Sequence, residues 1–273
     1  MKDIEIKAIQ DFENFKKFSK LHLTDSHCHI MDEKYTQSQE DLINEWFSNK
    51  GEHMFLIGVD VCSSEQMVKH AQKNKYVHAI VGIHPEHAKQ ATTEQIKSIE
   101  NLAPFACAIG EIGLDFYYGK DDEFEQLKLF KEQLSIAEKY NLPVCIHTRD
   151  AIQKTIDELK AHPNIKGVIH CYSGSKEMAR EFVKMGYKIG VGGIITFKNN
   201  KQLVESVLEV GINNIVIETD SPYLAPEPFR GQVNKPHNVY FVAKKIAELL
   251  NLTVDEVLSQ TTKNTLEIYK IKN

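Results

Sequence analysis

Two histidines separated by one residue, His27 and His29, form the first feature of the chain that could bind a metal ion. The segment Leu21–Ile30 alternates as a β-strand does, and side chains two apart on a strand point to the same side. Both imidazoles would then project from one face, where they can share an ion. Asp25 precedes them, and we expect its carboxylate to hold one ring by its second nitrogen. An isolated pair is more often two solvated or packed histidines, so the interpretation depends on further ligands elsewhere.

The elements that would position such ligands alternate regularly along the 273 residues. Apolar and β-branched runs predict eight strands, at Leu21–Ile30, Met54–Asp60, Val77–Ile83, Phe105–Ile112, Pro143–His147, Lys166–Cys171, Lys188–Ile195 and Asn214–Thr219. Helical segments lie between them. One is Glu123–Lys139, where apolar residues fall at steps of three and four, at Phe124, Leu127, Phe130, Leu134 and Ala137. This alternation predicts the α/β class, as a TIM-type (β/α)8 barrel of parallel strands.

No internal repeat, linker or low-complexity tract divides the chain. We therefore expect a single hydrolase barrel domain over residues 1–273. The charged residues 1–20 would form an extension, a short helix or strand, packed on the outside of the barrel. Thr253 and Glu256 fit a capping box that opens the last helix.

The barrel predicts where the chemistry lies, because catalytic groups in this architecture come from the C-terminal ends of different strands. Six of the expected strands end in polar residues of the required types, namely His27 with His29, His84, Glu111, His147, His170 and Asp220. Burying so many polar groups at one barrel mouth would be costly unless a metal ion or a substrate satisfied them. The whole set, rather than any member, predicts a metal centre.

Four histidines and two carboxylates without a thiolate suit Zn²⁺, Mg²⁺ or Mn²⁺. We expect two divalent ions with one shared carboxylate: His27, His29 and Asp220 would hold one ion, His147 and His170 the other, and Glu111 would bridge them. Two ions about 3.5–4 Å apart can lower the pKa of a shared water and stabilise both oxygens of an in-line displacement. Asp220 could also accept the proton of the nucleophile, so Asp220 and Glu111 are the expected catalytic residues.

Two residues outside the ligand set are candidates for substrate binding. His84 could bind a substrate phosphate, or it could hydrogen-bond a neighbour at the barrel end. Arg230 could bind a phosphate through its guanidinium fork, or it could form a salt bridge within its own loop. Arg149 is expected to be structural, paired with a carboxylate such as Asp150 or Asp115. Tyr117, Tyr118 and Tyr223 lie just beyond strand ends, where they could pack in the core or a loop or could stack on an unpaired base.

The composition limits the partners. The net charge is −5, and the sequence has no basic stripe of the kind that binds long nucleic acid electrostatically. Any affinity for phosphate would be local, and two bound divalent cations would supply it. The end of a nucleic-acid strand can enter a narrow barrel mouth without distortion of a duplex, so any such partner should be single-stranded or frayed. We expect no obligate protein partner.

The cysteines and the absence of long apolar runs bear on the compartment. The five cysteines are an odd number without a Cys-x-x-Cys pair, and each lies in an apolar segment. We expect buried free thiols rather than disulfides or a thiolate zinc site. No apolar run approaches the ~18 residues of a membrane span, and the first residues contain no hydrophobic signal core. These features predict a cytoplasmic protein without a membrane partner.

The motifs resemble those of the TatD family of metal-dependent deoxyribonucleases, within the amidohydrolase-like barrels. The resemblance covers about residues 22–270 and is carried by Asp25–His29, Gly110–Asp115, Ile146–Ala151, His170–Gly174 and Glu218–Leu224. It implies a two-metal hydrolase with a bridging Glu111, acting on DNA phosphodiesters, often as a 3′-to-5′ exonuclease. Two positions depart from the family: Glu86 where His is common, and Lys235 where Glu is common. Both lie where a substrate would enter.

Two other functions stay open. The same barrel and metals could hydrolyse a small ester, lactone, acyl-amino acid or phosphate substrate, and the acidic composition is compatible with this. A barrel that binds metal without activity is the third possibility, and the intact ligand set argues against it. A lysine at the bridging position would favour the carbamate-bridged amidohydrolases, whereas Glu111 stands there.

Overall fold

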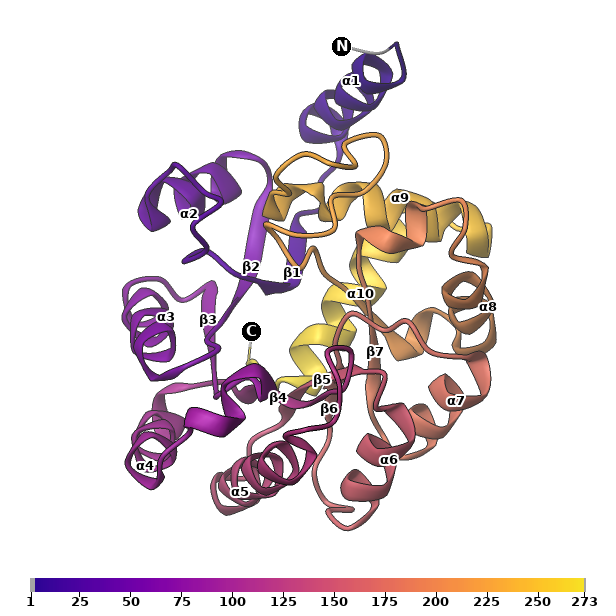
Figure 1. Cartoon of the computed structure of the whole chain (residues 1–273). Coiled ribbons are helices and arrows are strands. Elements are labelled where there is room, and N and C mark those ends of the chain that lie inside the picture. The colour runs from indigo at the N-terminus through magenta and orange to yellow at the C-terminus, as the bar shows by residue number, and fades with distance from the viewer. Residues whose placement is uncertain (1–2, 273) are drawn as a thin grey trace.

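Eight parallel strands form a nearly closed barrel in the computed structural model of the chain, which describes residues 3–272 (Figure 1). The strands are β1 Leu23–Cys28, β2 Gly51–Ile57, β3 Val77–Val81, β4 Ala108–Asp115, β5 Val144–Arg149, β6 Gly167–Ile169, β7 Lys188–Val191 and β8 Ile215–Ile217. Each strand pairs in parallel with the next in sequence, and a parallel bridge between Cys28 and Ser221 brings the two ends of the sheet together. The predicted (β/α)8 barrel is confirmed.

A ring of helices surrounds the strands in Figure 1. The helices of the described residues are α1 Asp3–Phe18, α2 Gln39–Ser48, α3 Val61–Lys73, α4 Thr93–Leu102, α5 Glu123–Tyr140, α6 Ile152–Lys160, α7 Lys176–Lys184, α8 Lys201–Val210, α9 Val239–Leu250 and α10 Val254–Ile268. The capping box of Thr253 and Glu256 opens α10 as predicted. None of these helices combines the length and the apolarity that a membrane span requires.

Alternation along the strands divides the core into two parts. In β2, Met54 and Leu56 belong to the larger cluster between sheet and helices, whereas Phe55 and Ile57 belong to a second cluster with Leu266 and Tyr269. Because Tyr269 directly follows α10, this helix and its end close the barrel at the N-terminal ends of the strands. The other end of the barrel is left for the chemistry.

Helix α1 lies outside the barrel, where it packs against α9. The ring of Phe12 lies 5.1 Å from that of Tyr240 and 6.1 Å from that of Phe241, measured between centroids. Phe15 stacks on Tyr240 from the next turn, with centroids 4.9 Å apart. These aromatic contacts give the otherwise charged helix a buried face.

Some details of the sequence prediction are wrong. Phe124 was expected on the buried face of α5, but its side chain is 75% exposed, because Gln126, Leu129 and Gln133 take the buried positions instead. Cys62 was expected to be buried, yet it is exposed in the first turn of α3. All five cysteines are free thiols, as predicted.

Candidate metal centre

The six predicted ligands come from five strands or from the residues just beyond them. His27 lies in β1 and His29 one residue past its end, while Glu111 and His147 lie within β4 and β5. His170 directly follows β6, and Asp220 lies three residues beyond β8. All six side chains meet at the C-terminal mouth of the barrel.

Two irregularities in the sheet turn the ligands inward. In β4 the register shifts between Ile109 and Ile112, and both of these side chains pack toward the helices although they are three residues apart. The shift reverses the alternation, so Glu111 faces the barrel interior. In β1 a similar shift lies between Asp25 and Cys28.

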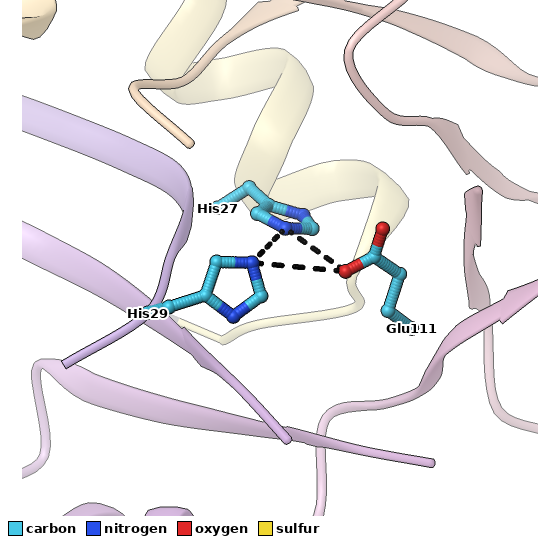
Figure 2. A group of neighbouring side chains, drawn as sticks. All are labelled: His27, His29 and Glu111. Carbon is cyan, nitrogen blue, oxygen red and sulfur yellow. Dashed lines mark hydrogen bonds and ion pairs between the residues drawn. The ribbon is translucent and has the colours of Figure 1, made fainter. Parts of the chain in front are cut away.

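The Glu111 carboxylate lies between two pairs of histidines. Figure 2 shows that the side chains of His27, His29 and Glu111 point toward one another. Oε2 of Glu111 is 3.4 Å from Nε2 of His27 and 3.7 Å from Nε2 of His29. Its Oε1 is 2.9 Å from Nδ1 of His147 and 3.2 Å from Nε2 of His170. Each oxygen therefore faces a different pair of imidazoles.

Asp220 joins the first of these pairs. Its Oδ1 lies 3.4 Å from Nε2 of His29 and 3.7 Å from Nε2 of His27, and the two histidine Nε2 atoms are 3.1 Å apart. The sequence predicts that His27, His29 and Asp220 hold one ion. The Asp220 carboxylate lies beside both of these histidines, and it also lies within 4.8 Å of ligand atoms of His170 and Cys171.

Burial is uneven across the centre. The side chains of His27, His170 and Glu111 are at most 4% exposed, whereas those of His29 and Asp220 are 16% and 14% exposed. His147 and His84 are also partly open, at 17% and 12%. A substrate would therefore approach from the side of the partly exposed residues.

The charges at the centre depend on one another. Burial would raise the pKa of Glu111, but the neighbouring His170 and His27 hold it well below the usual range. Burial would lower the pKa of His147, but hydrogen bonds to Asp115 and Glu111 raise it to about 8. Burial also opposes ionisation of Asp220, and its hydrogen bond to His29 outweighs this and lowers the pKa. Both expected catalytic carboxylates are thus ionised at neutral pH.

A second layer of carboxylates supports the histidines near Oε1 of Glu111. Nε2 of His147 lies 3.0 Å from Oδ2 of Asp115, and Nδ1 of His170 lies 3.1 Å from Oε1 of the buried Glu218. Glu218 also accepts a hydrogen bond of 2.5 Å from the backbone N–H of Cys171. A carboxylate behind a histidine fixes the ring and makes it a stronger ligand.

The predicted role of Asp25 is wrong. Its Oδ1 accepts hydrogen bonds from the backbone N–H groups of His27 and Thr219, and its Oδ2 accepts one from the Thr219 hydroxyl. The register shift after Asp25 breaks the alternation, so its side chain connects β1 to the segment after β8 instead of holding an imidazole. Nδ1 of His27 lies 3.3 Å from the Cys145 thiol instead.

The two candidate substrate-binding residues differ in position. His84 lies within the centre, with Nε2 3.7 Å from Oε1 of Glu111 and its ring centroid 4.5 Å from that of His147. Its Nδ1 accepts a hydrogen bond from the N–H of Glu86. Arg230 is exposed, and its Cζ lies 4.2 Å from the centroid of the Phe197 ring. Among the described residues, no hydrogen bond or ion pair joins Arg230 to the six ligands.

Two glutamines of α5 hold the loops that carry site residues. Gln126 accepts from the N–H of Asp115 and donates to its carbonyl, both at 2.8 Å. Gln133 makes the same pair of hydrogen bonds with Ile83, next to His84, at 2.7 and 2.9 Å. The two glutamines lie two helical turns apart, so one helix positions the ends of two strands.

Sequence reasoning did not assign Glu218, Asp115 or the two glutamines to the site. Glu218 and Asp115 belong to the strand-end motifs. An acidic residue that shares the barrel mouth with histidines was the sequence signal that could have identified both as partners of metal-binding histidines. Buried glutamine in an otherwise amphipathic helix was the signal for Gln126 and Gln133.

The residues fit divalent metal ions. Four imidazoles and two carboxylates, largely buried and without a lysine or arginine among them, form a donor set that a divalent ion would satisfy. Without an ion, protonated histidines such as His147 balance the carboxylates, and metal binding would displace those protons. The nitrogen and oxygen donors suit zinc, manganese or magnesium. Among the described residues, four groups of ligand atoms lie close enough to share an ion: His27, His29 and Glu111; His84, Glu111 and His147; His27, His170 and Glu218; and His170, Cys171 and Asp220.

Comparison with known proteins gives a consistent result. Residues 24–270 match a family model described as TatD-related DNase. The metal-dependent hydrolase YabD of Bacillus subtilis is 36% identical over 253 residues, which is 91% of this chain and 99% of that protein.

Solved structures agree. A TatD homologue from Escherichia coli, YjjV, has a TM-score of 0.85 and 28% identity, and the match covers 92% of this chain and 98% of that one. A TatD-family hydrolase from Entamoeba histolytica has a TM-score of 0.79 at 19% identity, covering 92% and 99%. The second likeness shows the fold alone.

Proposed function

The chain belongs to the family of TatD-related DNases, which makes it a metal-dependent hydrolase, and on that premise we propose that it cleaves DNA phosphodiester bonds at a centre of two divalent ions. We propose further that it removes nucleotides from the 3′ end of single-stranded or frayed DNA. Zn²⁺, Mg²⁺ and Mn²⁺ are the candidate ions.

The observation that carries the proposal is the position of Glu111. Its two oxygens face different pairs of imidazoles at 2.9–3.7 Å, which is the arrangement a bridging carboxylate needs. His27, His29 and Asp220 would hold one ion, and His147 and His170 the other. His84 borders the second group and is available to the substrate.

The chemistry divides between the ions and the chain. Divalent ions, when bound, would lower the pKa of a water and would supply positive charge to the phosphate oxygens. The Asp220 carboxylate, ionised and partly open to solvent, accepts a proton from the attacking water. His84 orients a phosphate oxygen on the open side of the centre. Glu218 and Asp115 keep the rings of His170 and His147 fixed, so that little reorganisation accompanies the reaction.

A second function, hydrolysis of a small ester, lactone, acyl-amino acid or phosphate substrate, is favoured by one observation. The net charge of −5 gives no long-range attraction for a polyanion. We place it second because the family model that matches the chain is that of DNases.

The experiment is a substrate panel with metal-reconstituted protein. Single strands labelled at the 3′ or the 5′ end, blunt duplex, closed circles, a p-nitrophenyl phosphodiester, a lactone and acyl-amino acids are incubated with Mg²⁺, Mn²⁺ or Zn²⁺. We expect loss of the 3′ label at the first cleavage and stepwise shortening of the 5′-labelled strand, with no cleavage by EDTA-treated protein or by Glu111→Gln. Turnover of the lactone or an acyl-amino acid without cleavage of any DNA would transfer the protein to the second function.

A further inference from the structure

Two adjacent tyrosines at the barrel mouth are unusually exposed. Tyr117 and Tyr118 lie two and three residues past the end of β4, and their side chains are 54% and 90% exposed. The rings meet edge to face, with centroids 4.8 Å apart and an interplanar angle of 84°. The mutual contact orients both rings while leaving one of them almost entirely in solvent.

The guanidinium of Arg149 lies against the two tyrosine rings. Cζ of Arg149 lies 3.5 Å from the centroid of Tyr117 and 5.9 Å from that of Tyr118. Among the described residues no salt bridge joins Arg149 to Asp115 or Asp150. Burial would raise the pKa of the Asp115 carboxyl, but hydrogen bonds from His147 and from the N–H of Tyr117 lower it, and the charge of Arg149 adds only a contribution that follows these. The guanidinium is instead stacked on an aromatic face, an arrangement that leaves its N–H groups available at the edge.

The Asp115 carboxylate connects the tyrosine segment to the candidate metal centre. Oδ1 of Asp115 accepts a hydrogen bond of 2.9 Å from the N–H of Tyr117, while Oδ2 of the same carboxylate lies 3.0 Å from Nε2 of His147. Arg149 follows His147 by two residues on β5, so both side chains point to the same side of the strand. The N–H of Phe116 also donates to the carbonyl of Arg149 at 2.9 Å. A ligand on this surface would thus lie next to the reacting phosphate.

We propose that Tyr117, Tyr118 and Arg149 form a stacking platform for an unpaired nucleobase of the strand whose phosphate lies at the metal centre. The inference rests on the proposed function and specifies which residues select a single strand. Aromatic faces bind bases of any sequence, and an arginine stacked on a ring adds attraction for both the base and its phosphate. Bases in a duplex are stacked on one another and cannot use the platform.

The test compares two single strands that differ only in their bases. One is a fluorescently labelled oligothymidylate, and the other is an abasic strand with the same number of phosphates. Both carry phosphorothioate linkages that slow hydrolysis, and binding to the metal-loaded protein is followed by fluorescence anisotropy. We expect the base-bearing strand to bind on the order of tenfold more tightly, the effect of one stacked base.

Variants assign the preference to the platform. Tyr118→Ala should bring the ratio of the two affinities toward one while leaving affinity for the abasic strand unchanged, and Tyr118→Phe should keep the ratio. Phe105→Ala, which removes a 58% exposed ring before β4 at the opposite end of the barrel, is the matched control and should change neither affinity.

The outcomes separate this inference from the proposed function. Equal binding of the two strands by the wild-type protein, or a ratio that survives Tyr118→Ala, would overturn the platform alone. Failure of both strands to bind at any metal concentration would overturn the proposed function and the platform with it.

Discussion

At the scale of single residues, the centre depends on how buried charges are compensated. Glu111 is almost fully buried, and the histidines on both of its sides hold its pKa well below the usual range in spite of that burial. Asp220 is ionised for a similar reason, through its hydrogen bond to His29. A divalent ion between these groups would bind the carboxylates and would displace the protons of imidazoles whose pKa values are raised, such as those of His147 and His170.

Asp220→Asn tests the proton acceptor. The substitution keeps the shape of the side chain, weakens its ligation and removes its basicity. We expect kcat on DNA to fall at least ~100-fold, the scale of a general base, with a smaller change in KM. Asp157→Asn on the exposed side of α6 is the control. Activity within a few-fold of wild type in the Asp220 variant would rule out the role.

Glu218→Gln tests a positioning residue. The amide keeps an oxygen for the Cys171 N–H but loses the charge that faces Nδ1 of His170. We expect affinity for the divalent ion near His170 to fall about 10- to 100-fold, measured by calorimetric titration of metal-free protein. Glu205→Gln, at an exposed surface ion pair, should titrate as wild type does. An unchanged affinity in a folded Glu218→Gln protein would mean that Glu218 only anchors the backbone.

At the scale of elements, α5 does more than cover the sheet. Gln126 and Gln133 satisfy the backbone N–H and carbonyl groups of Asp115 and Ile83, which no strand pairs. Such groups are costly to bury without partners, so the helix fixes the positions of Asp115 and His84.

Gln126→Leu tests this role of the helix. The leucine fits an amphipathic helix but leaves both backbone groups of Asp115 unpaired. We expect the free energy of unfolding to fall by about 1–3 kcal/mol, measured by denaturant titration. Gln72→Leu, exposed on α3, should change it by less than about 0.5 kcal/mol. A Gln126 variant as stable as the control would show that water replaces the glutamine.

The strands and α5 show which parts of the fold and of the candidate site could be predicted from the sequence. The eight strands and α5 follow from periodicity, because burial against a helix or a barrel interior imposes a period on the chain. The position of the strand-end residues follows from parallel topology, so the convergence of Glu111, His147 and Asp220 was predictable. The register shifts in β1 and β4 were not, because they depend on pairing with neighbouring strands. For that reason the role of Asp25 was predicted wrongly.

At the scale of the whole molecule, charge distinguishes this barrel from proteins that bind long nucleic acid. Its net charge is −5, and several of its exposed cations are paired with carboxylates on neighbouring helices, as Lys73 is with Glu40 and Arg180 with Glu209. Attraction for phosphate is therefore concentrated at the mouth.

The dependence of DNA affinity on salt concentration measures how many phosphates the protein contacts. We expect two or three phosphate contacts on a single strand, which gives a slope of about −1.4 to −2.1 for log K against log salt. Strand ends should be preferred to closed duplex circles, since a stiff duplex would have to bend or open. Rapid cleavage of closed circles with a steep salt slope would require a long binding groove.

The most direct test of the account is the number of metal ions bound per chain in wild-type protein and in Glu111→Gln. Elemental analysis after metal loading should give two divalent ions in the wild type, one in His147→Ala, and a joint loss from both sites in Glu111→Gln, because one carboxylate serves both. Two fully occupied sites in Glu111→Gln, or a single ion in the saturated wild-type protein, would contradict the bridged two-metal centre.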